Sequence, residues 1–436
     1  MNQSRAPGSF SIAPFRFEVT PPVGHPLLGG LVPPAVAVDD VLEAIGYVLL
    51  GIEAPVVVCV LDWAGLMNRS HHVWCAVLAE AAGTTPDRVA LHCVHQHNAP
   101  FVCGETQSLA ATAVDPCPLF DQTFFDRCLA RAKEAVREAL SRTQPVTQVA
   151  HGEAQIDRVA SNRRVARDRF GRVKVMRGSS CDDPSLRALP VGLIDRTLQT
   201  VAFFHDNQKI VSCHYYATHP MSYYRDGRIS SDFCGLARKL RQQEEPDCTH
   251  LYFTGCAGNI AAGKYNNGTA GDRVELTKRI HAGMIEAEAR LLPQPLDRWE
   301  WRSRSVLPAA RLPLSQQALG AVVMGTESER VGQLLQAYWQ SWQNRIDRKI
   351  PVTLSCLRLN ETSVLQMPGE PFIEFQLKAR ALHPHRPVAV AAYGDGGPWY
   401  IPTEEECPNG GYETMVAFSE PSFDRLLTAA MEELLA

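Results

Sequence analysis

Short apolar segments of strand length alternate along this chain with longer amphipathic segments of helix length, and this alternation restricts the fold more than any other feature. Val56–Leu61 and residues 89–94 are continuous apolar runs, which are typical of buried strands, and residues 72–82 between them have helical spacing. In residues 122–140 the apolar side chains recur at steps of three and four, the period of an amphipathic helix. The pattern predicts an α/β fold with mixed β-sheets flanked by helices.

The alternation continues to the end of the sequence. Further strands are expected at residues 146–156, 200–205, 209–216, 250–253, 352–359, 363–367 and 388–393, and further helices at 231–243, 272–292, 331–346, 371–382 and 421–435. No internal repeat or long Gly/Ser linker divides the chain, so one large catalytic domain over residues 1–436 is expected. The segments 98–120 and 157–190 are predicted to be long loops, which are usually functional in a compact chain.

Charge and composition exclude several classes of protein. Lys and Arg number 43 against 47 Asp and Glu, and this net charge of −4 gives no electrostatic footprint for a nucleic-acid or anionic-membrane partner. No apolar run approaches the ~18 residues that a transmembrane segment needs. The thirteen cysteines form no CxxC pair and no secretory signal is recognised, so a reduced, cytoplasmic protein is predicted.

Candidate functional residues follow the predicted strands. His95 and His97 come directly after one apolar run, and on an extended backbone residues two apart project to the same side. His219 follows a second strand, in A-T-H-P, and Glu370 follows a third, in M-P-G-E-P, where a helix N-terminus is predicted. Neutral imidazoles and carboxylates are common zinc ligands, although two hydrogen-bonded histidines at the surface would give the same pattern.

Two glycine-rich segments complete the candidate set. Residues 254–263, T-G-C-A-G-N-I-A-A-G, could offer backbone N–H groups to an oxyanion, but they match neither a phosphate-binding loop nor a dinucleotide fingerprint. Residues 393–413 present Tyr400 and Tyr412, twelve positions apart, on a loop rich in glycine and proline. Each motif is weak by itself.

Taken together and in order, these motifs resemble the neutral ceramidase family. The similar segments are R-F-E-V-T-P-P-V-G at 16–24, H-Q-H-N-A-P at 95–100, S-N-R-R at 161–164, the A-T-H-P and P-G-E motifs, and Y-I-P-T-E-E followed by G-G-Y-E. They span residues 16 to 413, and the family has the same spacing of twelve between its two tyrosines. The resemblance covers the family's catalytic domain.

The resemblance implies a Zn²⁺ site and a set of roles. Zinc is expected on four ligands, which are His95, His219, Glu370 and Tyr400. His97 would lie beside the metal-bound water, and Arg163 with Tyr412 would hold the carbonyl oxygen of the substrate. The implied activity is zinc-dependent hydrolysis of an N-acyl amide bond in a small-molecule substrate, as in sphingolipid metabolism.

The chain also departs from the family pattern. Ala261 stands where the family carries a catalytic serine, and neither a signal segment nor a C-terminal β-sandwich domain is expected in this sequence. Two alternatives therefore remain beside the amidase. One is a catalytically impaired, ceramidase-like protein that binds a metal or ligand without turnover, and the other is a metallo-esterase acting on a small cytosolic substrate. Asp232 is a candidate for orienting His219 through a hydrogen bond, or equally for capping a helix.

Overall fold

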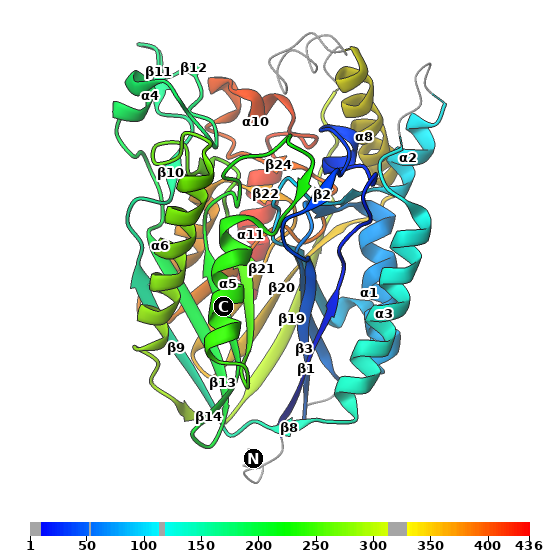
Figure 1. Cartoon of the computed structure of the whole chain (residues 1–436), viewed down its shortest axis with the longest axis vertical. Helices are drawn as coiled ribbons and strands as arrows, with labels where there is room; N and C mark the ends of the chain where they lie inside the picture. Colours follow the sequence, from blue (N-terminus) through cyan, green and yellow to red (C-terminus); the bar gives the residue numbers. More distant parts are fainter. Residues whose placement is uncertain (1–9, 52–53, 113–117, 313–328) are drawn as a thin grey trace.

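The computed structural model describes residues 10–51, 54–112, 118–312 and 329–436. Its main sheets contain five, five and four strands, and helices cover them on the outside (Figure 1). The predicted α/β fold with mixed sheets flanked by helices is confirmed. No helix in the described part of the chain is long and apolar enough to cross a membrane. The described cysteines are free thiols, and most of them are buried.

The N-terminal sheet has the strand order β6-β4-β3-β1-β8. Its strands are β1 (Ser11–Glu18), β3 (Glu43–Leu50), β4 (Val56–Leu61), β6 (Val89–Cys93) and β8 (Gln144–Pro145). Every residue of β4 is buried, as its uninterrupted apolar sequence predicts. Helices α1 (Asn68–Ala82) and α3 (Gln122–Leu140) pack against each other beside this sheet. The side chain of Asp121 caps α3 by accepting a hydrogen bond from the backbone N–H of Phe124.

Two further sheets complete the core. The second has the order β16 (Thr249–Thr254), β14 (Gln208–Tyr216), β13 (Thr197–His205), β9 (Gln148–Gln155) and β18 (Gln294–Pro295), and it is covered by α5 (Asp232–Glu244) and α6 (Ala270–Glu288). The third has the order β19 (Trp299–Val306), β20 (Val352–Leu359), β21 (Thr362–Gln366) and β23 (Val388–Ala391). It packs against α11 (Phe423–Leu435), which contacts α9 (Ile373–Leu382), while α8 (Glu329–Asp347) packs against α2 (Gly104–Ala110).

Each of the main sheets contains one parallel pair, and the ends of these pairs meet. The pairs are β4 with β6, β14 with β16, and β21 with β23. Backbone hydrogen bonds join Ala392 N to Thr254 O at 2.8 Å and Cys93 N to Tyr393 O at 2.9 Å, and Thr254 Oγ1 donates to Val94 O at 2.7 Å. Because these residues lie at the carboxyl ends of their strands, the segments that follow are brought to one place.

Short elements lie between the main ones, and some of them fall in the predicted loops 98–120 and 157–190. They are the strand pairs β2 (Ala37–Val38) with β15 (Arg228–Ile229), β5 (Gly65–Leu66) with β7 (Phe101–Val102), β10 (Ser161–Asn162) with β17 (Ile260–Ala261), β11 (Ala166–Arg167) with β12 (Val173–Val175), and β22 (Glu370–Pro371) with β24 (Tyr400–Ile401), and the helical turns Leu28–Gly30, Pro86–Arg88, α4 (Pro184–Ala188), Cys407–Asn409 and α10 (Tyr412–Met415). Residues 113–117 of the first predicted loop lie outside the described residues. Strands β1, β3 and β19 were not predicted from the sequence.

Three buried histidines make the stability of this fold dependent on pH. Burial lowers the pKa of His214 to about 3, and it lowers the pKa values of His92 and His250 to about 4. The unfolded chain binds protons at these rings near pH 6.5, whereas the folded chain does not, so the stabilising contribution is complete above that pH and is lost as the pH falls below it. We expect the free energy of unfolding to decrease by about 1.4 kcal/mol per pH unit for each ring.

Urea denaturation at a series of pH values between about 8 and 5 measures this slope. His214→Gln should reduce the slope by the contribution of one histidine, even where the variant is less stable at every pH. His205→Gln is the matched control, because the side chain of His205 is 43% exposed. Stability that stays constant or rises as the pH falls would contradict the prediction.

Candidate active site

The segment after β6 carries His95 and His97, and both rings face a common space. His95 has a φ of 79°, so the backbone is in the left-handed region, and the extended conformation assumed from the sequence is wrong. The two ring centroids nevertheless lie 5.1 Å apart. His95 Nδ1 donates a hydrogen bond to Ala64 O at 2.6 Å. The free lone pair of the ring is therefore on Nε2.

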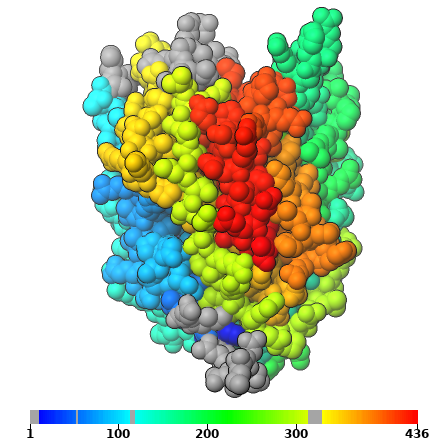
Figure 2. All heavy atoms as spheres, turned by 180° about the vertical axis from the view of Figure 1, so that it is seen from behind, coloured from blue at the N-terminus to red at the C-terminus, as the bar shows by residue number. Residues whose placement is uncertain are grey.

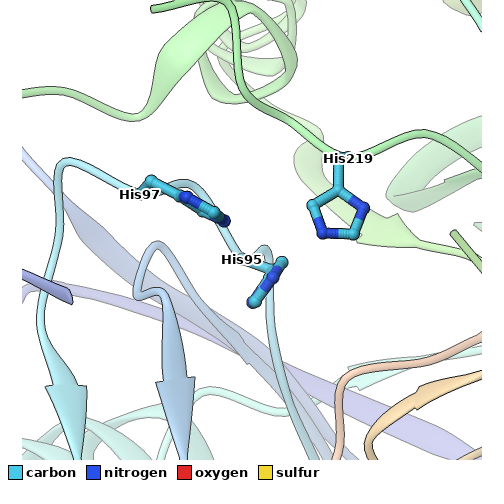
Figure 3. A group of neighbouring side chains, drawn as sticks. All are labelled: His95, His97 and His219. Carbon is cyan, nitrogen blue, oxygen red and sulfur yellow. The ribbon is translucent and has the colours of Figure 1, made fainter. Parts of the chain in front are cut away.

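His219 approaches from the segment after β14 and is completely buried. Its Nδ1 donates to Ala257 O at 2.7 Å, so the lone pair of the ring is on Nε2. Figure 3 shows the three histidine rings around one space, two from the segment after β6 and one from the segment after β14. The suggestion that Asp232 orients His219 is wrong, because its carboxylate accepts hydrogen bonds from Ser222 and from Phe233 N.

Glu370 supplies a carboxylate that lies close to the Nε2 atoms of both His95 and His219. Its Oε2 lies 3.3 Å from His95 Nε2 and 3.4 Å from His219 Nε2. Burial opposes ionisation of Glu370, but the adjacent histidines outweigh it and hold the pKa of this carboxyl well below its usual range. Glu370 was predicted to open a helix, and this is wrong. It begins the short strand β22, and α9 starts at Ile373.

The two separations at Glu370 Oε2 fit a tetrahedral zinc ion. Ligand bonds of about 2.0–2.1 Å at tetrahedral angles place neighbouring ligand atoms about 3.3–3.4 Å apart, which matches the two separations measured at Glu370 Oε2. His95 Nε2 and Glu370 Oε2 are buried and have no hydrogen-bond partner among the described residues. Unsatisfied buried donors and acceptors of this kind require an explanation, and a metal ion supplies one. Their assignment as ligands stays a prediction.

Tyr400 lies beside this cluster as the predicted fourth ligand. The parallel pairing of β22 with β24 places Tyr400 opposite Glu370, and its ring stacks over that of His219 with 6.3 Å between the centroids. Tyr400 Oη is hydrogen-bonded to Tyr412 Oη at 3.1 Å. Burial raises the pKa of Tyr400 well above its usual value, and the nearby carboxylate of Glu370 adds to this effect.

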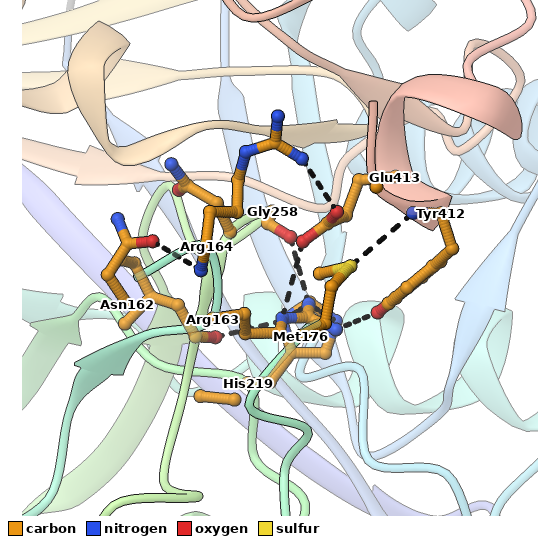
Figure 4. A network of polar contacts seen from close by, with 12 residues as sticks. Asn162, Arg163, Arg164, Met176, His219, Gly258, Tyr412 and Glu413 are labelled. Carbon is orange, nitrogen blue, oxygen red and sulfur yellow. Dashed lines mark hydrogen bonds and ion pairs between the residues drawn. The ribbon is translucent and has the colours of Figure 1, made fainter. Parts of the chain in front are cut away.

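Arg163 and Tyr412 contact each other beside His219, and Figure 4 shows this network of polar contacts. Arg163 donates from Nη1 to Tyr412 Oη, and its Nη2 donates to Gly258 O at 2.8 Å and lies 3.0 Å from His219 Nε2. Because a metal ion would need that same nitrogen of His219, metal binding requires Arg163 Nη2 to move away from it. Arg163 and Tyr412 come from segments that are almost 250 positions apart in the sequence, and the fold brings them into direct contact.

His97 is the titratable side chain of the site with no partner. It is largely buried, and neither ring nitrogen has a hydrogen-bond partner among the described residues. Burial lowers the pKa of His97 well below its usual value, and the neighbouring His95 and His219 lower it further, so the ring is neutral at pH 7. A neutral imidazole with a free nitrogen is able to accept a proton.

The site opens into a cavity with a volume of about 170 Å³. One part of its wall is polar and consists of His95, His97, Arg163, Glu370, Tyr400 and Tyr412. The other part is mainly apolar and includes Leu28, Leu31, Phe101, Met221, Trp399 and Val416. Such a wall accommodates a ligand with a polar group at one end and hydrocarbon at the other.

Two residues of the site were missed in the sequence. Tyr393 has a φ of 60°, its ring stacks on His95 with 4.4 Å between the centroids, and its hydroxyl lies 3.4 Å from His219 Nδ1. Ser179 lines the cavity, and its buried hydroxyl has no partner among the described residues. The position of Tyr393 directly before Gly-Asp-Gly-Gly was a usable signal, whereas nothing distinguishes Ser179 in the sequence.

The glycine-rich segment 254–263 acts through its carbonyl groups. The N–H groups of Gly255 and Gly258 donate to Tyr216 O and Pro371 O, so neither is free for an oxyanion. The carbonyls of Ala257 and Gly258 instead orient His219 and Arg163. Ala261 is completely buried, and its carbonyl accepts a hydrogen bond from Ser161 Oγ at 2.8 Å.

Among the solved structures that share this fold are two ceramidase structures. They are a ceramidase complexed with C2 and the neutral ceramidase from Pseudomonas aeruginosa, with sequence identities of 15% and 16%. Each matches with a TM-score of 0.69 over 98% of this chain and 74% of its own. No family model and no curated protein matches the sequence. The fold expected from the resemblance to neutral ceramidases is therefore confirmed, and at this identity the likeness concerns the fold alone.

Proposed function

We propose that this protein is a zinc-dependent hydrolase of N-acyl amides. The observation that carries the proposal is that Glu370 Oε2 lies 3.3 Å from His95 Nε2 and 3.4 Å from His219 Nε2, the separations expected between ligands of a tetrahedral site. This cluster lies in a cavity whose wall also presents Arg163 and Tyr412, which are able to bind a carbonyl oxygen. The names of the structures with the same fold favour an amide over an ester substrate.

In this proposal His95, His219 and Glu370 hold the zinc ion, with Tyr400 as the fourth ligand. When bound, zinc polarises the scissile carbonyl and lowers the pKa of a bound water towards about 7. His97 accepts a proton as water adds to the carbonyl carbon, and then returns it to the amide nitrogen as the C–N bond breaks. One carboxylic acid and one amine are formed from one amide and one water.

Arg163 and Tyr412 stabilise the oxygen on which negative charge develops. Tyr412 is held in place before the substrate binds, because its backbone N–H donates to Met176 Sδ at 3.4 Å and its hydroxyl is hydrogen-bonded to Tyr400 Oη at 3.1 Å. Donors fixed in a buried site lose little energy to reorganisation during the reaction. The apolar part of the cavity would receive the acyl chain, and the substrate is a small N-acyl molecule.

Metal removal tests the proposal directly. Protein purified without chelator should contain about one zinc per chain by elemental analysis and should hydrolyse members of a panel of N-acyl amides. A chelator should abolish the activity, and added zinc should restore it. A protein with zinc but no turnover on the amides or on matched esters would support the alternative of a binding protein, and activity on the esters alone would support the metallo-esterase.

The same preparation tests the nucleophile. Because Ala261 has no hydroxyl, reagents that acylate catalytic serines should leave the activity unchanged. A rapid burst of about one product molecule per enzyme molecule, followed by slower turnover, would indicate a covalent intermediate and would contradict direct attack by water.

A further inference from the structure

The β11–β12 hairpin carries an exposed aromatic tip beside the candidate active site. Phe170 at the turn is 69% exposed, and Val175 on β12 is 50% exposed. Figure 1 shows this hairpin at the same end of the molecule as α10, whose first residue is Tyr412. In the view from behind, the green segment that contains it rises above the body of the molecule (Figure 2). A large apolar side chain held away from the core in this way is available to a partner.

Basic side chains surround this tip. Arg169, Arg172 and Lys174 are exposed, and within the described residues no ion pair involves them. The guanidinium of Arg169 lies 4.7 Å from the centroid of the Phe170 ring. The one acidic residue of the hairpin, Asp168, is used by the turn, since its Oδ1 accepts hydrogen bonds from Phe170 N and Arg172 N. The chain as a whole is acidic, but this hairpin is locally basic.

The hairpin is attached to the wall of the cavity at both ends. Arg163 precedes it and Ser179 follows it, and both residues line the cavity. An ion pair of 3.0 Å between Arg167 and Glu406 joins its first strand to the segment before α10. Met176, directly after its second strand, accepts the hydrogen bond from Tyr412 N. A partner surface that binds the tip of the hairpin would therefore lie close to the candidate active site.

We propose that this hairpin docks on the surface of an anionic lipid bilayer. Phe170 would enter the headgroup region, where aromatic side chains are favoured, while Arg169, Arg172 and Lys174 would bind lipid phosphates. The charge is complementary to anionic lipids, and the exposed aromatic and aliphatic side chains favour a bilayer over a nucleic acid or an acidic protein. Docking would bring acyl-bearing substrates from the bilayer to the apolar part of the cavity, and this last step rests on the proposed function.

Vesicle sedimentation with the full chain tests the proposal. The probes are phosphatidylcholine vesicles with and without phosphatidylserine. The hairpin variants are Phe170→Asp and the double variant Arg169→Glu/Arg172→Glu. The matched controls are Leu292→Asp, at a side chain that is 74% exposed, and Arg137→Glu/Arg142→Glu, at exposed side chains in the last turn of α3 and just after its end. Circular dichroism verifies that each variant is folded.

The wild type and both controls should bind the vesicles that contain phosphatidylserine, with affinity that falls as salt is added. Each hairpin variant should bind these vesicles at least about tenfold more weakly. Phe170→Asp removes the apolar side chain that would enter the bilayer, and Arg169→Glu/Arg172→Glu reverses the charges that would bind lipid phosphates. Equal binding to both kinds of vesicle, no binding by the wild type, unaltered binding by the hairpin variants, or hairpin-dependent binding to RNA alone would overturn the proposal.

The outcome is separable from that of the proposed function. Vesicle binding is measured without catalysis, so hairpin-dependent binding by a protein that hydrolyses no N-acyl amide would support the docking surface and contradict the hydrolase. Where hydrolysis occurs, the hairpin variants should retain wild-type rates on a water-soluble, short-chain substrate. They should lose at least about tenfold in rate on the same headgroup presented in vesicles with phosphatidylserine.

Discussion

His219→Ala should remove both the bound zinc and at least about a thousandfold of the N-acyl hydrolysis. The substitution deletes one of the two imidazole nitrogens that lie beside Glu370 Oε2, and the remaining ligands would not retain the ion. The chain should nevertheless stay folded, because the core of three sheets does not depend on the site. Zinc content, rate and the thermal melt are measured on the same preparation.

His205→Ala serves as the control for this variant, because its side chain is 43% exposed and lies at the far end of β13. It should keep the zinc, the rate and the melting transition of the wild type. If His219→Ala keeps its zinc, His219 is not a ligand. If it loses its cooperative melt, the cluster has a structural role instead of a catalytic one.

Replacing Arg163 by Met should lower the rate of hydrolysis by about 10²–10³-fold, the usual effect of removing one donor to a developing oxyanion. Zinc should be retained, because the guanidinium is not a ligand and its loss frees His219 Nε2. The cost in stability should be moderate, about 1–3 kcal/mol, since Gly258 O and Tyr412 Oη lose a donor. Glu413 keeps its closer partner Arg164, at 3.0 Å.

Arg164→Met is the matched comparison, at the adjacent and equally buried arginine. Arg164 faces away from the histidines towards the carboxylates of Glu413 and Glu406, as Figure 4 shows for Glu413. The substitution removes the closest partner of the fully buried Glu413, which keeps only Arg163 at 3.9 Å, so this variant should lose about 3 kcal/mol of stability. The folded fraction should keep most of its activity. Urea denaturation and steady-state kinetics separate the two effects, and a larger loss of rate in Arg164→Met would reverse our assignment.

Local sequence determined most of the secondary structure. The apolar run Val56–Leu61 and the helix Gln122–Leu140 have the predicted bounds, because continuous apolar residues and a period of 3.6 are properties of the segment itself. Strand β19, W-E-W-R-S-R-S-V, was missed, since most of its residues are partly exposed and its pairing with β20 was not visible in the segment. Several candidate residues were also recognisable, because chemically distinctive side chains follow the strands.

Only the tertiary structure decided how those residues meet. The left-handed turn at His95, the pairing of Glu370 with Tyr400 and the carbonyls that orient His219 depend on contacts between distant segments. The same is true of the contact between Arg163 and His219 Nε2, which no spacing in the sequence predicts. The sequence by itself therefore determined which side chains are available and which elements carry them. The junction of the three parallel strand pairs determined their distances, because hydrogen bonds between remote strand ends fix the segments that follow.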